Sequence, residues 1–221
     1  MTKRGLIFDL DGTLVDSLPG IAEALNAALE GNGLHGHSEQ AIRTFIGNGL
    51  ETTVRRACPA GNNDETLVAR LVESFHQHYQ STWRSRTLVY PRIRELLSDL
   101  ASDTTALAVL ANKSHACAVG MIAEIFPEIP FACILGLQPG APAKPHPAGA
   151  LEIARTIALA PNQCQIIGDS TMDIDTAKNA SMGSCAVTFG YHDDARLRAA
   201  RPDHIVANVP DLREWLANPA D

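Results

Sequence analysis

The sequence predicts an α/β fold, a doubly wound parallel sheet with an inserted all-helical unit. Short apolar runs without strict alternation are separated by segments with helical periodicity, and one long stretch near the N-terminus shows helical periodicity alone. Strands that are apolar throughout are typical of a parallel sheet covered on both faces. The expected strands are 5–8, 105–110, 131–135, 165–168, 185–189 and 204–206.

Amphipathic helices are expected between these strands. Residues 91–100 and 147–158 each place branched or small apolar side chains on one stripe, at the spacing of a helix that packs on a sheet. From 15 to 84 the strand signal disappears and helical patterns follow one another, as at Ile21, Leu25 and Leu29. We therefore expect an α/β core of residues 1–14 and 85–221, and an inserted helical cap of residues 15–84.

Composition excludes several classes of function. The 221 residues carry a net charge of −7 and no run of Lys or Arg, which argues against a nucleic-acid partner. The longest apolar stretch, 106–111, is far short of the roughly 20 residues that a membrane helix needs. Five dispersed cysteines indicate reduced thiols rather than disulfides. Since the N-terminus also lacks a signal peptide pattern, we expect a cytoplasmic protein without a membrane partner.

Residues 31–36 match the GxGxxG pattern of dinucleotide-binding sites, but they lack its structural context. They follow a predicted helix, whereas the pattern needs a strand before it and a helix after it. A helix stop explains these glycines better.

Acidic residues follow two of the predicted strands. Asp9 and Asp11 leave the first strand through Gly12, and Asp169 and Asp173 follow the strand at 165–168. The carboxyl ends of strands in an open parallel sheet line the ligand crevice. Clustered carboxylates repel one another, and a hard cation such as Mg²⁺ would compensate them. Helix capping is the alternative for either cluster alone.

Two further segments carry candidate functional groups. Lys144 lies between prolines and small residues just before a helix, where a stiff segment would hold its ammonium in place. Asn112 closes the strand that begins at Thr105, where backbone N–H groups would meet an anion.

These segments together resemble the haloacid dehalogenase-like superfamily of aspartate-nucleophile phosphotransferases. The matching stretches are FDLDGTLVDS at 8–17, LANK at 110–113, KPHP at 144–147 and GDSTMD at 168–173. The resemblance covers essentially the whole chain, with a helical cap inserted after the first stretch. Within the superfamily, the cap segment 38–57 most resembles phosphoglycolate phosphatases.

The resemblance implies a role for each acidic residue and for Lys144. Asp9 would attack phosphorus and form an aspartyl phosphate, and Asp11 would act as general acid and then as general base. The carboxylates of Asp9 and Asp169 and the backbone carbonyl of Asp11 would hold Mg²⁺, with Asp173 joining or supporting that shell. Lys144 would pair with Asp9 and the transferring phosphoryl group.

The favoured function is a phosphatase that hydrolyses a small phosphorylated metabolite, and 2-phosphoglycolate is the favoured substrate. We expect the protein to be a monomer or a homodimer. Asp11 argues for phosphate esters, because a halide leaving group needs no proton. Besides Asn112, the candidates for substrate binding are Gly47, Asn48 and Gly49, whose backbone amides would approach a small carboxylate. Arg43 and Arg55 are candidate counter-charges.

One departure from the family pattern bears on the rate. Ala111 stands where the pattern has Ser or Thr, whose hydroxyl binds a phosphate oxygen. We therefore expect a slower phosphatase. The alternatives are a pyrophosphatase, a phosphosugar phosphatase or mutase with the same machinery, and a weakly active phosphate-binding or regulatory protein.

Overall fold

The computed structural model describes residues 3–59, 64–101 and 104–217. Contacts divide the chain into two compact units, one formed by Met1–Val15 with Val89–Asp221 and the other by Asp16–Leu88. In the part that the structure describes, no helix is long and apolar enough to cross a membrane.

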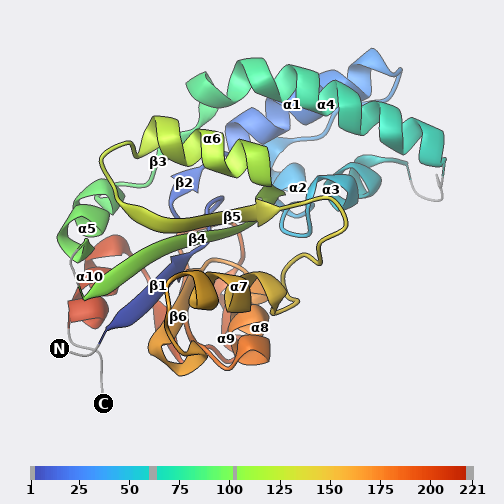
Figure 1. The fold of residues 1–221 in the computed structure, drawn as a ribbon. Helices are drawn as coiled ribbons and strands as arrows, with labels where there is room; N and C mark the ends of the chain where they lie inside the picture. Colours follow the sequence, from blue (N-terminus) through green and yellow to red (C-terminus); the bar gives the residue numbers. More distant parts are fainter. Residues whose placement is uncertain (1–2, 60–63, 102–103, 218–221) are drawn as a thin grey trace. The chain divides into compact units, whose positions relative to one another are not determined.

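The first unit contains a six-stranded sheet in the order β5-β4-β1-β6-β7-β8, in which every pair of neighbours is parallel. Figure 1 labels β5, β4, β1 and β6 of this sheet, in that order. This confirms the predicted α/β class. The strands are β1 (Arg4–Phe8), β4 (Thr105–Ser114), β5 (Phe131–Leu137), β6 (Cys164–Gly168), β7 (Gly183–Val187) and β8 (His204–Val206).

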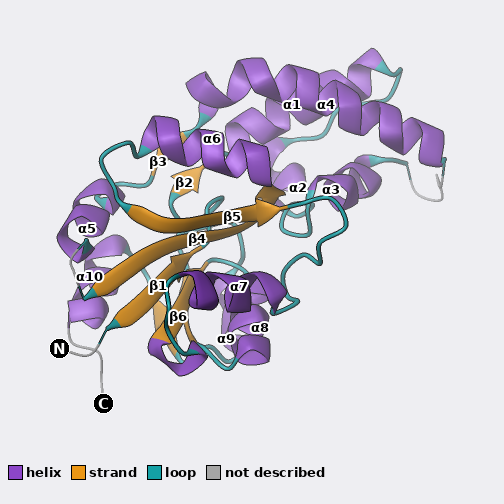
Figure 2. Ribbon diagram, in the orientation of Figure 1, coloured by secondary structure: helices purple, strands orange, loops and turns teal. Residues whose placement is uncertain are grey.

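Helices cover both faces of this sheet (Figure 2). Helices α5 and α6 belong to crossovers that run one way along the sheet and lie on one face, and α7, α8 and α9 belong to crossovers that run the other way and lie on the opposite face. Helix α10 follows the last strand and packs on α5. The bounds of these helices are α5 (Ile93–Leu100), α6 (His115–Ile125), α7 (Ala148–Thr156), α8 (Thr171–Ala180), α9 (Asp194–Ala199) and α10 (Val209–Ala217). Because both faces are covered, neighbouring residues of β1 such as Leu6 and Ile7 are both fully buried.

Of the six predicted strands, only β8 has the predicted bounds. Strands β1 and β6 each begin one residue earlier and β5 ends two residues later, at Leu137, while β7 is shifted and β4 is extended. The strand predicted at 185–189 is β7, Gly183–Val187. It begins earlier because the Asp203 carboxylate accepts hydrogen bonds of 2.8 Å from both the amide and the hydroxyl of Ser184, so a polar residue is satisfied inside the strand. β4 runs four residues beyond the predicted end at 110, to Ser114.

The second unit is built mainly from helices. They are α1 (Leu18–Gly31), α2 (Glu39–Arg43), α3 (Leu50–Ala57) and α4 (Glu65–Arg86). Helices α1 and α4 pack on each other through buried side chains that include Leu25 and Leu71. The chain passes from one unit to the other within two short strands, β2 (Val15–Asp16) and β3 (Leu88–Val89), which pair with each other.

Candidate functional site

Adjacent strands bring the two acidic segments together. Strand β1 pairs with β6, and the amide of Asp9 continues that pairing by donating to the Ile167 carbonyl at 2.8 Å. Asp169 follows the end of β6, and Asp173 lies in the first turn of α8. Crossovers leave β1 and β6 toward opposite faces of the sheet, so the two segments meet at the topological switch point, where α/β sheets bind ligands.

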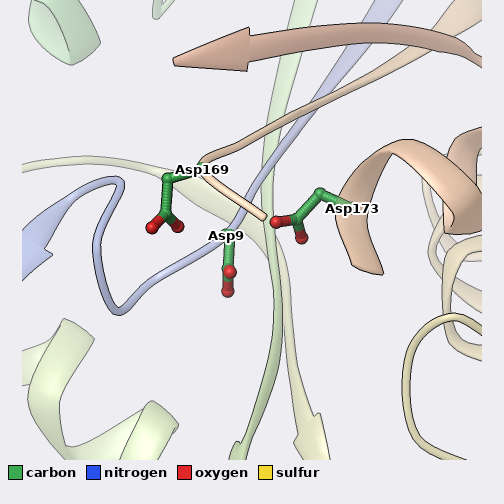
Figure 3. Close-up of side chains that lie close together, drawn as sticks. All are labelled: Asp9, Asp169 and Asp173. Atoms are coloured by element: carbon green, nitrogen blue, oxygen red, sulfur yellow. The ribbon is translucent and has the colours of Figure 1, made fainter. Parts of the chain in front are cut away.

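Asp9, Asp169 and Asp173 form a cluster of three carboxylates. Each offers one oxygen, and the three oxygens lie within 4.8 Å of one another. Figure 3 shows the three side chains converging from three segments of the chain. Asp169 and Asp173 are only 2% and 1% exposed, so little solvent screens their repulsion.

Lys144 supplies one positive charge to this cluster. Its ammonium lies 2.9 Å from Asp9 Oδ1 and 2.6 Å from Asp173 Oδ1. Burial alone would lower the pKa of Lys144, but the carboxylates of Asp173 and Asp9 raise it above its ordinary value. The Lys144 ammonium therefore bridges two of the three acids.

Burial and mutual repulsion raise the pKa values of two of the three acids. Burial and the neighbouring Asp173 carboxylate raise the pKa of Asp9 well above its ordinary value, against the opposing effect of Lys144. The same two causes raise the pKa of Asp169 to about 7, although the Tyr191 amide donates to its carboxylate at 2.6 Å. One ammonium is thus too little positive charge for three carboxylates of which two are buried and one is 12% exposed.

Asp173 serves both as a cap and as a member of the cluster. Its Oδ2 accepts hydrogen bonds from the amide and the hydroxyl of Ser170, at 3.1 and 2.6 Å, in a capping box at the start of α8. Its Oδ1 is the oxygen that faces Lys144. The capping alternative therefore accounts for one oxygen of Asp173 and leaves the other directed into the cluster.

Gly12 allows the chain to turn close beside Asp169. It has a φ of +87°, in the region that favours glycine, and a Cβ at this position would overlap the Asp169 carboxylate. Thr13 follows, and its hydroxyl donates to Asp169 Oδ1 at 3.2 Å. The turn after β1 therefore also orients an acid that follows β6.

The Asn112 side chain holds the backbone of Lys144. Asn112 Oδ1 accepts from the Lys144 amide at 2.8 Å, and its Nδ2 donates to the Lys144 carbonyl at 3.1 Å. Sequence reasoning placed Asn112 against the substrate, and that role stays a prediction. What the structure adds is a reciprocal pair of hydrogen bonds across 32 positions of sequence that positions the bridging lysine.

The Asp11 carboxylate lies apart from the three-acid cluster and pairs with Lys113. The Lys113 ammonium is 3.1 and 3.3 Å from the two carboxylate oxygens. Only 9% of the Lys113 side chain and 16% of the Asp11 side chain are exposed. The predicted metal ligand of Asp11 is its backbone carbonyl, not its carboxylate. The ion pair with Lys113 therefore does not test that prediction.

The three predicted substrate-binding residues of the helical unit lie in the loop before α3. Gly47 and Gly49 have φ of +120° and +84°, and Gly49 is the N-cap of α3. The Arg56 guanidinium braces this loop by donating to the Phe45 carbonyl at 2.9 Å and to Asn48 Oδ1 at 2.8 Å. Whether the loop binds substrate stays a prediction.

The donor set of the three-acid cluster suits a hard divalent cation. Three carboxylate oxygens, two of them from buried residues, lie within reach of one ion, and the raised pKa values of Asp9 and Asp169 are consistent with a deficit of positive charge. Carboxylate oxygens without nitrogen or sulfur favour Mg²⁺ over softer metals.

Comparison with known proteins assigns the chain to a family. Residues 6–187 match the family model of the haloacid dehalogenase-like hydrolases. The chain belongs to the haloacid dehalogenase-like hydrolases. Phosphoglycolate phosphatase from Yersinia pestis is 31% identical to it over 98% of this chain and 94% of its own length. The Escherichia coli K12 phosphoglycolate phosphatase is 30% identical over 98% and 93%.

Solved structures of this family share the fold. The crystal structure of a predicted phosphoglycolate phosphatase from Haemophilus somnus 129PT superposes with a TM-score of 0.90 at 29% identity, covering 98% of this chain and 99% of that one. A putative phosphoglycolate phosphatase from Lactobacillus delbrueckii gives a TM-score of 0.87, also at 29% identity, over 97% and 98%.

Sequence reasoning missed the contacts of three groups at the site of this haloacid dehalogenase-like hydrolase. They are the Lys113 ammonium, the Thr13 hydroxyl on Asp169 and the backbone amide of Tyr191. Lys113 and Thr13 stand inside matched stretches, so their positions were visible although their contacts were not. The Tyr191 amide leaves no mark in the sequence, because any residue except proline offers the same donor.

Proposed function

We propose that this protein is a Mg²⁺-dependent phosphatase that hydrolyses a small phosphomonoester through an aspartyl phosphate on Asp9, with 2-phosphoglycolate as the favoured substrate. The observation that carries the proposal is the cluster of Asp9, Asp169 and Asp173, in which the Lys144 ammonium pairs with Asp9 and Asp173. The names of the relatives support the choice of substrate.

Asp9 is the proposed nucleophile. The Leu10 amide donates to its Oδ1 at 2.7 Å, and Lys144 contacts the same oxygen, so the carboxylate is held in one orientation. In the first step an Asp9 oxygen bonds to phosphorus while the bond from phosphorus to the leaving oxygen breaks. Splitting the hydrolysis in this way replaces one difficult step by two easier ones.

Asp11 is the proposed general acid and base. Protonated Asp11 gives its proton to the leaving oxygen in the first step, and its carboxylate then takes a proton from water. That water attacks the phosphorus of the aspartyl phosphate, which releases phosphate and restores Asp9.

Asp9, Asp169 and Asp173, with the backbone carbonyl of Asp11, would hold Mg²⁺. When bound, the ion offsets the repulsion between the anionic nucleophile and the anionic ester. The protein's own contribution is to keep these carboxylates in place before the ion arrives, through the Thr13 hydroxyl, the Tyr191 amide and the Ser170 cap.

Phosphate release from a panel of small phosphomonoesters tests the proposal. We expect Mg²⁺-dependent release, fastest with 2-phosphoglycolate, and a loss of at least about 1,000-fold in Asp9→Asn. Thermal melting of that variant checks that it is folded. No release from any ester by the wild type with Mg²⁺ would contradict the proposal, and equal weak release from all of them would contradict the choice of substrate.

A further inference from the structure

Lys113 lies in an irregular stretch of β4 at the carboxyl edge of the sheet. From Leu110 to Ser114 the strand advances four residues, while its partner β5 advances two, from Leu135 to Leu137. Such bulges turn side chains out of the alternation of a regular strand. Here two consecutive side chains reach into the site, Asn112 to the Lys144 backbone and Lys113 to Asp11.

The opposite strand is shaped to admit this bulge. A Cβ on Gly136 of β5 would come within 2.7 Å of the Lys113 carbonyl oxygen and of His115 Cα. Glycine therefore lets the two backbones approach, and the Gly136 amide also donates to His115 Nδ1 at 3.3 Å. The position of Lys113 follows from the packing of two strands and does not depend on a flexible loop.

Lys113 differs from the other three lysines of the chain in what surrounds it. Lys144 already bridges two carboxylates, Lys178 is exposed on α8, where it donates to the Ala200 carbonyl, and Lys3 directly precedes β1 at the other end of the sheet. Lys113 alone of the four is nearly buried against the proposed general acid. In the helical unit, Arg55, one of the candidate counter-charges, is matched by Glu51 and Glu65.

The chemistry of the proposed reaction puts the leaving group next to this ammonium. Asp11 must reach the leaving oxygen to protonate it. In an ester of the glycolate type, a single CH₂ separates that oxygen from a carboxylate. Since Lys113 contacts both oxygens of Asp11, a carboxylate so close to the leaving oxygen comes within its reach.

We propose that Lys113 is a specificity-determining residue, which binds a carboxylate carried by the leaving alcohol beside the ester oxygen. The proposal rests on the proposed function, because it takes Asp11 as the acid for the leaving group. An ammonium has three donors, so Lys113 serves a substrate carboxylate and Asp11 through different N–H groups. A cation that is only 9% exposed gains more from such a partner than a solvated one does.

A pair of isosteric substrates tests the proposal. We would measure kcat/KM with Mg²⁺ for 2-phosphoglycolate and for its uncharged amide, 2-phosphoglycolamide, in the wild type and in Lys113→Met. The expected result is a fall of about 10- to 150-fold in the acid-to-amide ratio, the range for a lost hydrogen bond to a charged group. The ratio cancels any effect of the substitution on Asp11, because both substrates need that residue equally.

Two further variants separate charge recognition from general damage. Lys113→Arg retains the cation and should retain a preference for the acid, whereas Lys178→Met removes the same charge elsewhere and should leave the ratio unchanged. Thermal melting checks each variant, and Lys113→Gln replaces Lys113→Met if the latter does not fold. An unchanged ratio in folded Lys113→Met, with both esters turned over, would overturn the proposal.

A binding experiment keeps this proposal separate from the proposed function. Calorimetric titration of Asp9→Asn with each ester, with and without Lys113→Met, measures the same discrimination without turnover. A wild type that releases no phosphate contradicts the phosphatase. Acid and amide binding to Asp9→Asn with equal affinity contradicts the role of Lys113.

Discussion

Restoring a hydroxyl at position 111 should accelerate the enzyme. Ala111 is 3% exposed and lies at the start of the β4 bulge, directly before Asn112. The family pattern has a hydroxyl here that binds a phosphate oxygen. A hydrogen bond to a charged group contributes about 1.5 to 3 kcal/mol, so Ala111→Ser and Ala111→Thr should raise kcat/KM by about 10- to 150-fold if the transition state feels the full bond.

The steric cost of the larger side chain at position 111 decides whether the gain in kcat/KM can be measured. Adding atoms to a close-packed core typically costs about 1 to 3 kcal/mol, enough to hide it. Ala111, however, helps to line a cavity of about 160 Å³ whose wall also includes Leu110, Leu135 and Lys144. Since a water molecule occupies roughly 30 Å³, this cavity has room for a hydroxyl and a methyl group. We therefore expect the bond to outweigh the crowding.

The assay is phosphate release from 2-phosphoglycolate at saturating Mg²⁺, with kcat and KM determined separately and melting temperatures recorded for every variant. Ala116→Ser, an exposed change of the same kind on α6, is the matched control and should leave both constants unchanged. If folded Ala111→Ser and Ala111→Thr turn over no faster than the wild type, the missing hydroxyl does not limit this enzyme and the reasoning is refuted.

Two other predictions test the cluster. Mg²⁺ should stabilise the wild type by about 1.4 kcal/mol for each tenfold rise above its Kd, or roughly 3 to 6 °C in Tm. Asp169→Asn should abolish this shift and Asp175→Asn should keep it; equal shifts in both would exclude Asp169 as a ligand. Asn112→Ala should lower kcat about 10- to 100-fold by releasing Lys144, whereas the exposed Asn208→Ala should not. An unchanged kcat would show that Lys144 holds its position without the amide.

The sequence predicts the parallel sheet because that part of the fold depends on periodicity. Apolar runs locate all six strands, and the predicted 204–206 coincides with β8. Periodicity does not reveal where a strand begins or ends when a distant residue satisfies the hydrogen bonds of a polar residue inside the strand. Asp203 extends β7 backward to Gly183 through Ser184, and this partner lies 19 positions away in sequence.

The candidate site, like the fold, has parts that the sequence predicts and parts that it does not. Asp9 and Asp169 are visible from sequence because each follows an apolar strand, and parallel strands end at one edge. The bulge in β4 has no such signal, since Ala-Asn-Lys fits a regular strand end equally well. In a regular strand, side chains 112 and 113 would point to opposite faces of the sheet. The contacts of Asn112 and Lys113 therefore become apparent only in the three-dimensional structure.

Charge balance connects the cluster to the cation that it is proposed to hold. Three ionised carboxylates and the Lys144 ammonium sum to two negative charges, which a divalent ion brings to zero. The Lys113–Asp11 pair is already neutral and adds nothing to this sum. Without an ion, burial offers no solvent to absorb the surplus, and the pKa values of Asp9 and Asp169 rise in response. The hydrogen bonds to Asp169 and Asp173 hold the acids together against that repulsion, so the protein itself bears the cost of assembling the site before the ion binds.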